Sequence, residues 1–276
     1  MSVEMNGMYI PFAKAPDSMP RYVRPALFST GDEKWELQVC GSAFLAKYHG
    51  WHFGLATAHQ TNTNKGGPDA SKFVVLVEED GRTLAVPPVN LHIPSIDDDA
   101  DQALKDLTFF DYGSVEPKYR AHHLDLSNVF WSDDVGVTDY SFLVGYPTSS
   151  AVITLDPDDY SALSSFQARW IRQDLQAGAP QSLDPEHRDI FVKHEKSKRL
   201  SVPPDGLSGS PVFSIVSIPT GERFLRFDGI VTNALADRFA VYPSVHIKDM
   251  LDDIIAARVK KAADAVSDPA LSHDPQ

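Results

Sequence analysis

Cysteine is nearly absent from this chain. Cys40 is the single cysteine among 276 residues, which excludes a disulfide within the chain. Disulfides persist in oxidising compartments and are rare in the cytosol, so their absence favours a reducing compartment. The N-terminal segment also lacks the basic and apolar regions of a secretory signal peptide. We therefore expect a cytoplasmic protein.

Positive charge and long apolar runs are scarce as well. The chain has 25 Lys and Arg residues against 38 Asp and Glu residues, for a formal net charge of -13. No Lys- or Arg-rich stripe is present, whereas proteins that bind a phosphate backbone carry a basic face. No run approaches the roughly 18 apolar residues needed to span a bilayer. Neither nucleic acid nor a membrane is expected as a partner.

Long amphipathic helical patterns are missing before the C-terminal region. Short apolar runs bounded by Gly, Pro, Asn and Asp predominate instead, and this pattern predicts an all-β sandwich or barrel. The runs are residues 35–39, 42–47, 51–56, 73–77, 83–86, 107–112, 141–144, 151–155, 211–216 and 227–231.

Three segments interrupt the strand pattern. Residues 94–106 are acidic and predict an exposed loop, and residues 177–188 are rich in Pro and polar residues and predict a surface loop. Residues 156–176 fit either a short helix or an irregular strand pair. Helical spacing of apolar residues predicts a helix over 244–263 with Ser244 as its N-cap, followed by a flexible tail at 264–276.

Three motifs carry residue types that suit nucleophilic catalysis. One apolar run ends in the sequence ATAH, whose last residue is His59. Histidine suits a general base because its unperturbed pKa is about 6.5. Asp106 directly precedes another apolar run, and Ser208 lies in the turn DGLSGSP. Gly206 and Gly209 flank this serine and allow a tight turn whose N–H groups converge on one point. Such a turn can form an oxyanion hole.

The order His, Asp, Ser along the chain differs from the order in α/β-hydrolases, where the serine comes first within G-x-S-x-G. Here Ser210 stands where that motif has its second glycine, and Pro211 begins a strand rather than a helix. This argues against an esterase-like acyl hydrolase.

Six blocks resemble blocks of one protease family. They are GSAFL (41–45, similar to GSGFL), ATAH (56–59, similar to TAAH), DLTFF (106–110, similar to DIALL), GYP (145–147, a turn of bacterial members), GLSGSPV (206–212, similar to GDSGGPV) and FDGIVTNA (227–234, similar to GIVSWG). Across about residues 30–260, the chain therefore resembles the trypsin-like serine proteases of the chymotrypsin fold, of the bacterial intracellular type.

This resemblance implies an all-β fold of two antiparallel six-stranded β-barrels with a C-terminal α-helix. A single protease domain would cover residues 1–263. Its N-terminal barrel would lie at about 25–125 and its C-terminal barrel at about 126–243.

The resemblance also implies a serine endopeptidase. Ser208 would be the nucleophile, His59 the general base and Asp106 the residue that orients His59. The N–H groups of Gly206 and Ser208 would form the oxyanion hole. The substrate would pair as an added strand with Thr232, Asn233 and Ala234. No cofactor and no metal is expected, and the expected partners are a protein or peptide substrate and a dedicated regulatory partner.

Three positions depart from the family pattern. Gln60 follows His59 where many secreted members have a disulfide-bonded cysteine. Leu207 precedes Ser208 where secreted digestive members have an aspartate, so activation by N-terminal insertion is not expected. Val202 aligns with the base of the primary specificity pocket, which favours a small or apolar residue before the scissile bond.

Several alternatives remain at this point. Asp111 is the second candidate for the triad acid, and Asp205 and Asp237 lie near the expected pocket in sequence. A catalytically latent, protease-like peptide-binding module is the alternative function. Four further histidines are expected to be surface or loop residues: His49, His52, His122 and His123.

Overall fold

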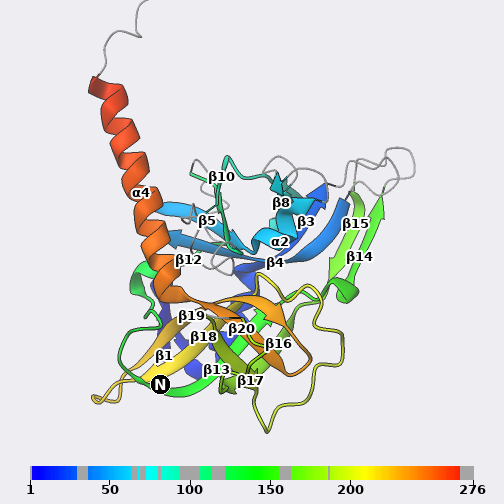
Figure 1. Cartoon of the computed structure of the whole chain (residues 1–276), viewed down its shortest axis with the longest axis vertical. Helices are drawn as coiled ribbons and strands as arrows, with labels where there is room; N and C mark the ends of the chain where they lie inside the picture. The colour runs from blue at the N-terminus through cyan, green and yellow to red at the C-terminus, as the bar shows by residue number, and fades with distance from the viewer. Residues whose placement is uncertain are drawn as a thin grey trace, which may run out of the picture.

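The computed structural model describes residues 2–29, 37–63, 67–68, 73–79, 82–93, 106–113, 122–155, 163–185 and 187–267. Strands dominate these residues, as the short apolar runs predict, and most of them belong to two large sheets. In Figure 1 an open sheet lies above a closed barrel, and a long C-terminal helix runs along one side.

The C-terminal half forms a closed six-stranded barrel, which confirms the predicted C-terminal barrel. The strand order around the barrel is β13-β16-β17-β20-β19-β18, and every neighbouring pair is antiparallel. The strands are β13 (Val137–Gly145), β16 (Ile171–Ala177), β17 (Asp189–Lys193), β18 (Pro211–Ser217), β19 (Arg223–Ala234) and β20 (Arg238–Pro243).

The N-terminal half forms an open sheet and not the expected six-stranded barrel. Its order is β10-β11-β5-β4-β3-β8-β9, with β12 added in parallel beside β4. Pro87 and Pro88 lie between β9 and β10, and proline cannot donate a ladder hydrogen bond. Two successive prolines also keep this short connection extended and disfavour a tight hairpin turn. The two edge strands, β9 and β10, are not paired with each other within the described residues. The strands are β3 (Val23–Ser29), β4 (Leu37–Tyr48), β5 (Trp51–Ala56), β8 (Phe73–Glu79), β9 (Arg82–Val86), β10 (Asn90–His92), β11 (Thr108–Asp111) and β12 (Leu124–Asp125).

The segment 156–176, for which both a helix and a strand pair were possible, forms strands in its described residues, although its two strands do not pair with each other. β14 (Ala151–Leu155) and β15 (Leu163–Ala168) form a hairpin, and β16 follows β15 after two residues. Residues 178–185 and 187–188 have no regular structure, as expected for a surface loop. Most of the predicted acidic loop, 94–105, lies outside the described residues.

The first residues form a separate two-stranded sheet that packs against the C-terminal barrel, which the sequence did not predict. β1 (Ser2–Met5) and β2 (Met8–Pro11) form a hairpin, and β1 contacts β19. Val3 and Met5 are buried in the same core cluster as Phe213 and Phe227. Three short helical segments, η1 (Phe12–Lys14), α1 (Ala15–Ser18) and η2 (Met19–Arg21), then lead to β3.

One aromatic core joins the two sheets. The ring of Phe44 on β4 lies 5.6 Å from that of Phe213 on β18 and 5.2 Å from that of Phe227 on β19, centroid to centroid. All three side chains are buried. Aromatic pairs at such distances add favourable quadrupole contacts to area burial. This shared core fixes the facing ends of the two sheets relative to each other.

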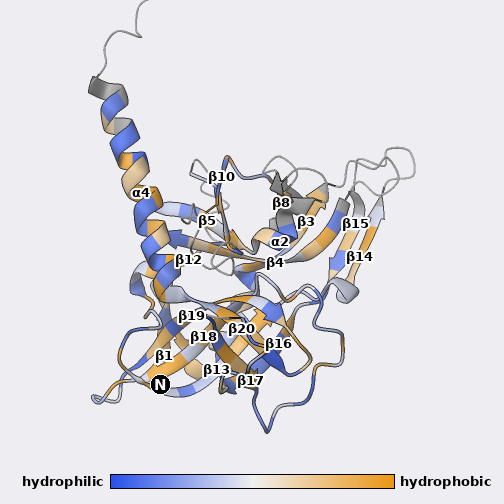
Figure 2. Ribbon diagram, viewed as in Figure 1, coloured by the Kyte–Doolittle hydropathy of each residue, from blue (hydrophilic) through white to orange (hydrophobic). Residues whose placement is uncertain are grey.

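The C-terminal helix begins at the predicted residue. α4 (Ser244–Ser267) buries Ile247 and Leu251, whereas Val259 is 58% exposed. It ends four residues later than predicted, because the segment KKAADA after Val259 favours helix, so the predicted tail at 264–276 starts too early. Figure 2 shows polar residues along its projecting part and apolar residues on the barrel strands.

Within the part of the chain that the structure describes, no helix combines the length and apolarity needed to cross a bilayer.

Candidate active site

His59 and Asp106 meet where two paired strands of the open sheet have adjacent ends. β5 leads into α2 (Ala58–Thr61), which carries His59, and Asp106 lies just before β11. The antiparallel register pairs Thr108 with Ala56, so the end of β5 lies beside the start of β11. His59 Nδ1 is 2.9 Å from both carboxylate oxygens of Asp106, and the His59 backbone N–H donates to Oδ1 over 3.0 Å. This carboxylate therefore fixes both the ring and the backbone of His59.

Asp111, the second candidate for the triad acid, has a different role. It is fully buried at the end of β11 and forms an ion pair with Arg258 of α4. His92 Nε2 lies 3.5 Å from its Oδ2. Asp111 thus attaches the helix to the open sheet, and Asp106 is the carboxylate beside His59.

The helical turn that holds His59 is stabilised by half of a capping box. In the sequence TAHQ, the Thr57 N–H donates to Gln60 Oε1 over 2.8 Å. A Thr followed three residues later by Gln is the pattern that satisfies the free donors at the start of a helix. Thr57 Oγ1 lies 3.3 Å from His59 Nε2, the ring nitrogen opposite Asp106.

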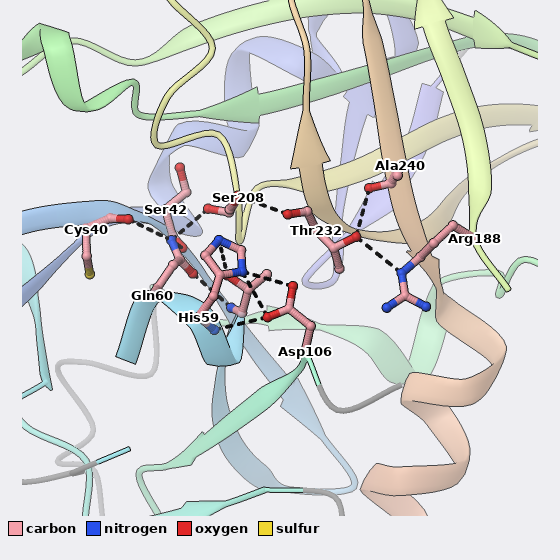
Figure 3. Close-up of polar contacts among 10 residues, drawn as sticks. Cys40, Ser42, His59, Gln60, Asp106, Arg188, Ser208, Thr232 and Ala240 are labelled. Atoms are coloured by element: carbon pink, nitrogen blue, oxygen red, sulfur yellow. Dashed lines mark hydrogen bonds and ion pairs between the residues drawn. The ribbon is translucent and has the colours of Figure 1, made fainter. Parts of the chain in front are cut away.

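Ser208 lies in a tight turn of the closed barrel, between β17 and β18. Gly206 and Gly209 have φ angles of +89° and +82°, which glycine adopts without strain. Ser208 Oγ donates to the Thr232 carbonyl over 3.1 Å. Figure 3 shows His59, Asp106 and Ser208 gathered in one place. Among the described residues, no hydrogen bond joins Ser208 to His59.

Two N–H groups of this turn have no acceptor among the described residues, and they belong to Gly206 and Ser208. Their neighbours are all engaged: Leu207 N–H donates to the Pro204 carbonyl, Gly209 N–H to Val231 and Ser210 N–H to Leu207. The two groups predicted to form the oxyanion hole are therefore the ones that the turn leaves available.

The direction of the Gly206 N–H is set by Thr148, in the short helical turn η6 (Thr148–Ser150). Thr148 N–H donates to the Asp205 carbonyl over 2.8 Å. A trans peptide points its carbonyl and the next N–H in opposite directions, so this bond turns the Gly206 N–H away from Thr148. A Cβ at Gly206 would lie 2.6 Å from Thr148 N, so the close approach requires glycine.

Gln60 connects the two halves of the site, a role that was not predicted from the sequence. Its side chain is 7% exposed, and its Nε2 donates to the Ser208 carbonyl over 2.8 Å. The same Nε2 lies 3.3 Å from the carbonyls of Cys40 and Ser42 on β4. One amide thus joins the His59 helix, strand β4 and the nucleophile turn. The T-x-x-Q capping pattern is the sequence signal that could have identified it.

Ser42 adds a second connection between the sheets. Its N–H donates to the Ser208 carbonyl over 3.1 Å, and its Oγ donates to the Gly206 carbonyl over 3.0 Å. Tyr146 N–H in turn donates to Ser42 Oγ over 2.8 Å. The backbone of the nucleophile turn is therefore held from the side of the open sheet.

The three predicted substrate-pairing residues lie at the end of β19. β18 pairs with β19 only as far as Ile230, so β18 does not cover the edge at 232–234. Thr232 is buried at a bulge, Asn233 is exposed and Ala234 is partly buried. This edge begins where Thr232 meets Ser208.

Leu207, directly before the nucleophile, is fully buried in the core of the closed barrel. Val202, expected at the base of a specificity pocket, is partly buried in an irregular segment. Asp205 is exposed, and Asp237 lies 3.6 Å from Arg199 in an exposed ion pair.

Of the four remaining histidines, His52 alone contradicts the prediction of a surface or loop position, because it lies in strand β5. His49 is exposed in the turn between β4 and β5, as expected, and His122 is half-buried beside Arg24. His52 and His123 are buried, with ring centroids 4.8 Å apart. His52 lies within β5, whose two faces are both covered, so its side chain cannot reach the surface. His123 lies in the irregular segment before β12 and is a loop residue, as expected, although its side chain is buried. Within the described residues, no group of three or more His, Cys, Asp and Glu residues could hold a metal ion.

A scan against models of protein families and a search among curated proteins both found no match to this chain. The functional argument therefore rests on the geometry of the site.

Proposed function

We propose that this protein is a serine endopeptidase that cleaves peptide bonds through a Ser208-His59-Asp106 triad and an acyl-enzyme. The observation that carries the proposal is the convergence of a carboxylate-bound histidine with a serine turn that leaves two N–H groups available. Nucleophile, base, orienting acid and oxyanion donors are the four parts that acyl transfer to serine needs.

The first half of the reaction forms the acyl-enzyme. Ser208 Oγ attacks the carbonyl carbon while His59 Nε2 takes the hydroxyl proton. Asp106 holds Nδ1–H and stabilises the resulting imidazolium. The Gly206 and Ser208 N–H groups bind the oxyanion of the tetrahedral intermediate. The C–N bond then breaks as His59 returns the proton to the leaving amine.

The second half releases the product. A water molecule gives a proton to His59 Nε2 and attacks the ester carbonyl, again forming an oxyanion in the same site. The bond to Ser208 Oγ breaks, and His59 returns the proton to that oxygen. The enzyme is restored and no cofactor is consumed.

One observation favours a second function, a latent module that binds peptides without cutting them. Ser208 Oγ donates to the Thr232 carbonyl, and His59 Nε2 has Thr57 Oγ1 as its neighbour. The catalytic form needs Ser208 Oγ to turn about its Cα–Cβ bond towards His59. Such rotations between staggered rotamers are fast in accessible side chains, so we favour the active enzyme.

Covalent labelling distinguishes the two functions. The wild type, Ser208→Ala and Ser217→Ala are treated with a fluorophosphonate, and intact mass is recorded. We expect one adduct on the wild type and on Ser217→Ala, in which a serine of β18 away from the site is changed, and none on Ser208→Ala. Well-folded wild type that takes up no adduct would support the latent module.

We further propose that the enzyme acts in the cytoplasm on a restricted set of protein targets, under a dedicated regulatory partner. The single cysteine supports this setting, because disulfides are rare in the cytosol. Rapid, indiscriminate degradation of casein by the purified protein would contradict the restricted targets.

We also propose that the intact chain needs no cut to become active. In secreted digestive members of the trypsin-like family, cleavage of the chain creates a new N-terminal amine, which pairs with an aspartate directly before the nucleophilic serine. Leu207 stands at this position and cannot accept an ion pair. Activity that rises only after cleavage near the N-terminus would overturn this proposal.

A further inference from the structure

The hydroxyl of Thr57 lies at the nitrogen that the proposed reaction needs as its base. Thr57 is fully buried directly before α2, and its Oγ1 is 3.3 Å from His59 Nε2. Among the described residues, this nitrogen is the one hydrogen-bond partner of the Thr57 hydroxyl. Thr57 stands where the resembled block TAAH has an alanine, so the family pattern does not supply this contact.

The direction of this hydrogen bond follows from Asp106. Both oxygens of its carboxylate lie 2.9 Å from His59 Nδ1, so the carboxylate accepts the proton on that nitrogen. The neutral imidazole ring then has its single acceptor lone pair at Nε2. Thr57 Oγ1 therefore donates to Nε2, and Ser208 can donate to the same lone pair only after Thr57 has left it.

Ser208 is held away from His59 by a second threonine. Its Oγ donates to the Thr232 carbonyl over 3.1 Å. Thr232 is itself fixed, because its Oγ1 accepts from Arg188 Nε over 3.2 Å and donates to the Ala240 carbonyl over 3.3 Å. Figure 3 shows Thr232 between Ser208 and Arg188. The nucleophile and the base are thus each bonded to a threonine in the free protein.

A peptide strand paired with residues 232–234 changes this balance. β18 does not cover β19 at this edge, and the Thr232 carbonyl faces Ser208 there. The N–H groups of an added strand bond to carbonyl groups of the edge that it joins. A peptide N–H at the Thr232 carbonyl competes with the Ser208 hydroxyl, which then turns to His59 Nε2.

We infer that Thr57 restrains the free enzyme by holding His59 Nε2 until a peptide paired with residues 232–234 displaces Ser208 from Thr232. This inference rests on the proposed endopeptidase function and adds regulation of the same site by its substrate. The restraint lowers the fraction of free enzyme that is ready to react, and the apparent affinity for substrate falls by the same factor.

Labelling rates of the free enzyme test the restraint. The second-order rate constant for a small fluorophosphonate is measured for the wild type, Thr57→Val and Thr57→Ser. Thr57→Val keeps the shape of the side chain and removes its hydroxyl, so we expect labelling roughly 5-fold faster than in the wild type, the effect of one net hydrogen bond. Thr57→Ser keeps a hydroxyl and should label at close to the wild-type rate.

Thr108→Val is the matched control for the loss of a buried threonine hydroxyl. Thr108 is also fully buried, and its Oγ1 has no hydrogen-bond partner among the described residues. We expect it to label at the wild-type rate. Unchanged or slower labelling of Thr57→Val, or equally fast labelling of Thr108→Val, would overturn the restraint. If neither the wild type nor Thr57→Val were labelled at all, Ser208 itself would fail as the nucleophile.

Steady-state kinetics test the release by substrate. The substrate is a peptide amide long enough to pair with residues 232–234, and it reacts slowly relative to its dissociation, so that KM reports binding. Thr57→Val should lower KM roughly 5-fold and leave kcat near wild type, because the bound peptide has already displaced Thr57. A higher kcat at unchanged KM would show that Thr57 still holds His59 in the complex and would overturn the release.

Discussion

The two sheets hold their parts of the site in different ways. The closed barrel positions Ser208 through backbone bonds, such as Gly209 N–H to the Val231 carbonyl and Val231 N–H to Ser210. The open sheet positions His59 through a single helical turn and the side chains of Asp106 and Gln60. One half of the site belongs to a continuous ladder, and the other half depends on a few side-chain contacts.

This difference locates the sensitive points of the site. A barrel has no free edges, so its turns are fixed by pairing on both sides. The open sheet ends in edge strands. His59, the general base at this sheet, is aligned by the side chains of Asp106 and Gln60, and a single substitution can remove either of them. We therefore expect substitutions at the side-chain contacts of the open sheet to separate activity from stability, and substitutions in the barrel to affect backbone geometry.

The largest expected effect is at the acid that orients His59. Asp106→Asn should lower kcat by about 10⁴ with little loss of stability, because the amide cannot hold the required tautomer of the histidine. Asp111→Asn is the matched control. It breaks a buried ion pair with Arg258, so it should cost roughly 3 kcal/mol of unfolding free energy and leave kcat near wild type.

Kinetics and urea unfolding of both variants check this prediction. If Asp111→Asn lowered kcat by the larger factor while Asp106→Asn did not, the assignment of the triad acid would be reversed.

Next in size is the barrel turn. Gly206→Ala places a Cβ 2.6 Å from Thr148 N at a φ of +89°, so the peptide that carries the oxyanion donor must move. We expect kcat to fall by about 10²–10³, the usual cost of losing one such donor. Gly221→Ala is the control, since it also has a positive φ, +86°, but open space around its Cβ. Similar losses of kcat in both variants would show that strain, and not the donor, is responsible.

The two sheets should respond to pH in opposite directions. Burial raises the pKa of Asp228 on β19 to about 6, although Arg226 and Ser214 act against it. The stability that the protonated form contributes is complete below pH 3.8 and is lost as pH rises through 6, by about 3 kcal/mol. In the open sheet, burial lowers the pKa of His92 and His122 from 6.5. The neutral forms of these two histidines therefore stabilise the folded state above pH 6.5, and this stabilisation is lost as pH falls below that value.

Hydrogen exchange measured by mass spectrometry at about pH 5 and about pH 7.5, corrected for intrinsic rates, checks these signs. Protection of β18 and β19 should decrease at the higher pH, and protection of β10 and β11 at the lower pH. Asp228→Asn should flatten the barrel response only. A barrel that became more protected at the higher pH would contradict the raised pKa of Asp228.

The smallest expected effect is at the amide that joins the sheets. Gln60→Leu should lower kcat about tenfold with little change in KM, because the carbonyls of Ser208, Cys40 and Ser42 lose their shared donor. Gln173→Leu is the matched control, since Gln173 is also buried but lies on β16 of the barrel, and among the described residues its side chain donates only to the carbonyl of its neighbour Asp174. Gln173→Leu should change stability and leave kcat unaltered, and a kcat that falls equally in both variants would remove the positioning role of Gln60.

Several features of this protein were determined by local sequence. The short apolar runs specified strands, and glycines at 206 and 209 specified a turn that only residues without a Cβ can form. The helical spacing after Ser244 specified α4. These features depend on neighbours within a few positions along the chain, so periodicity and turn chemistry predict them.

Other features were decided by tertiary structure. The N-terminal sheet is open because its two edge strands, β9 and β10, do not pair within the described residues. His52 and His123 are buried with their rings in contact, although the two residues lie far apart in the sequence. The choice between Asp106 and Asp111 depended on the register of β5 and β11, and the position of Arg188 beside Thr232 depended on the pairing of β17 with β20. These contacts join residues from distant parts of the chain, and only the paired and packed strands determine which of them meet.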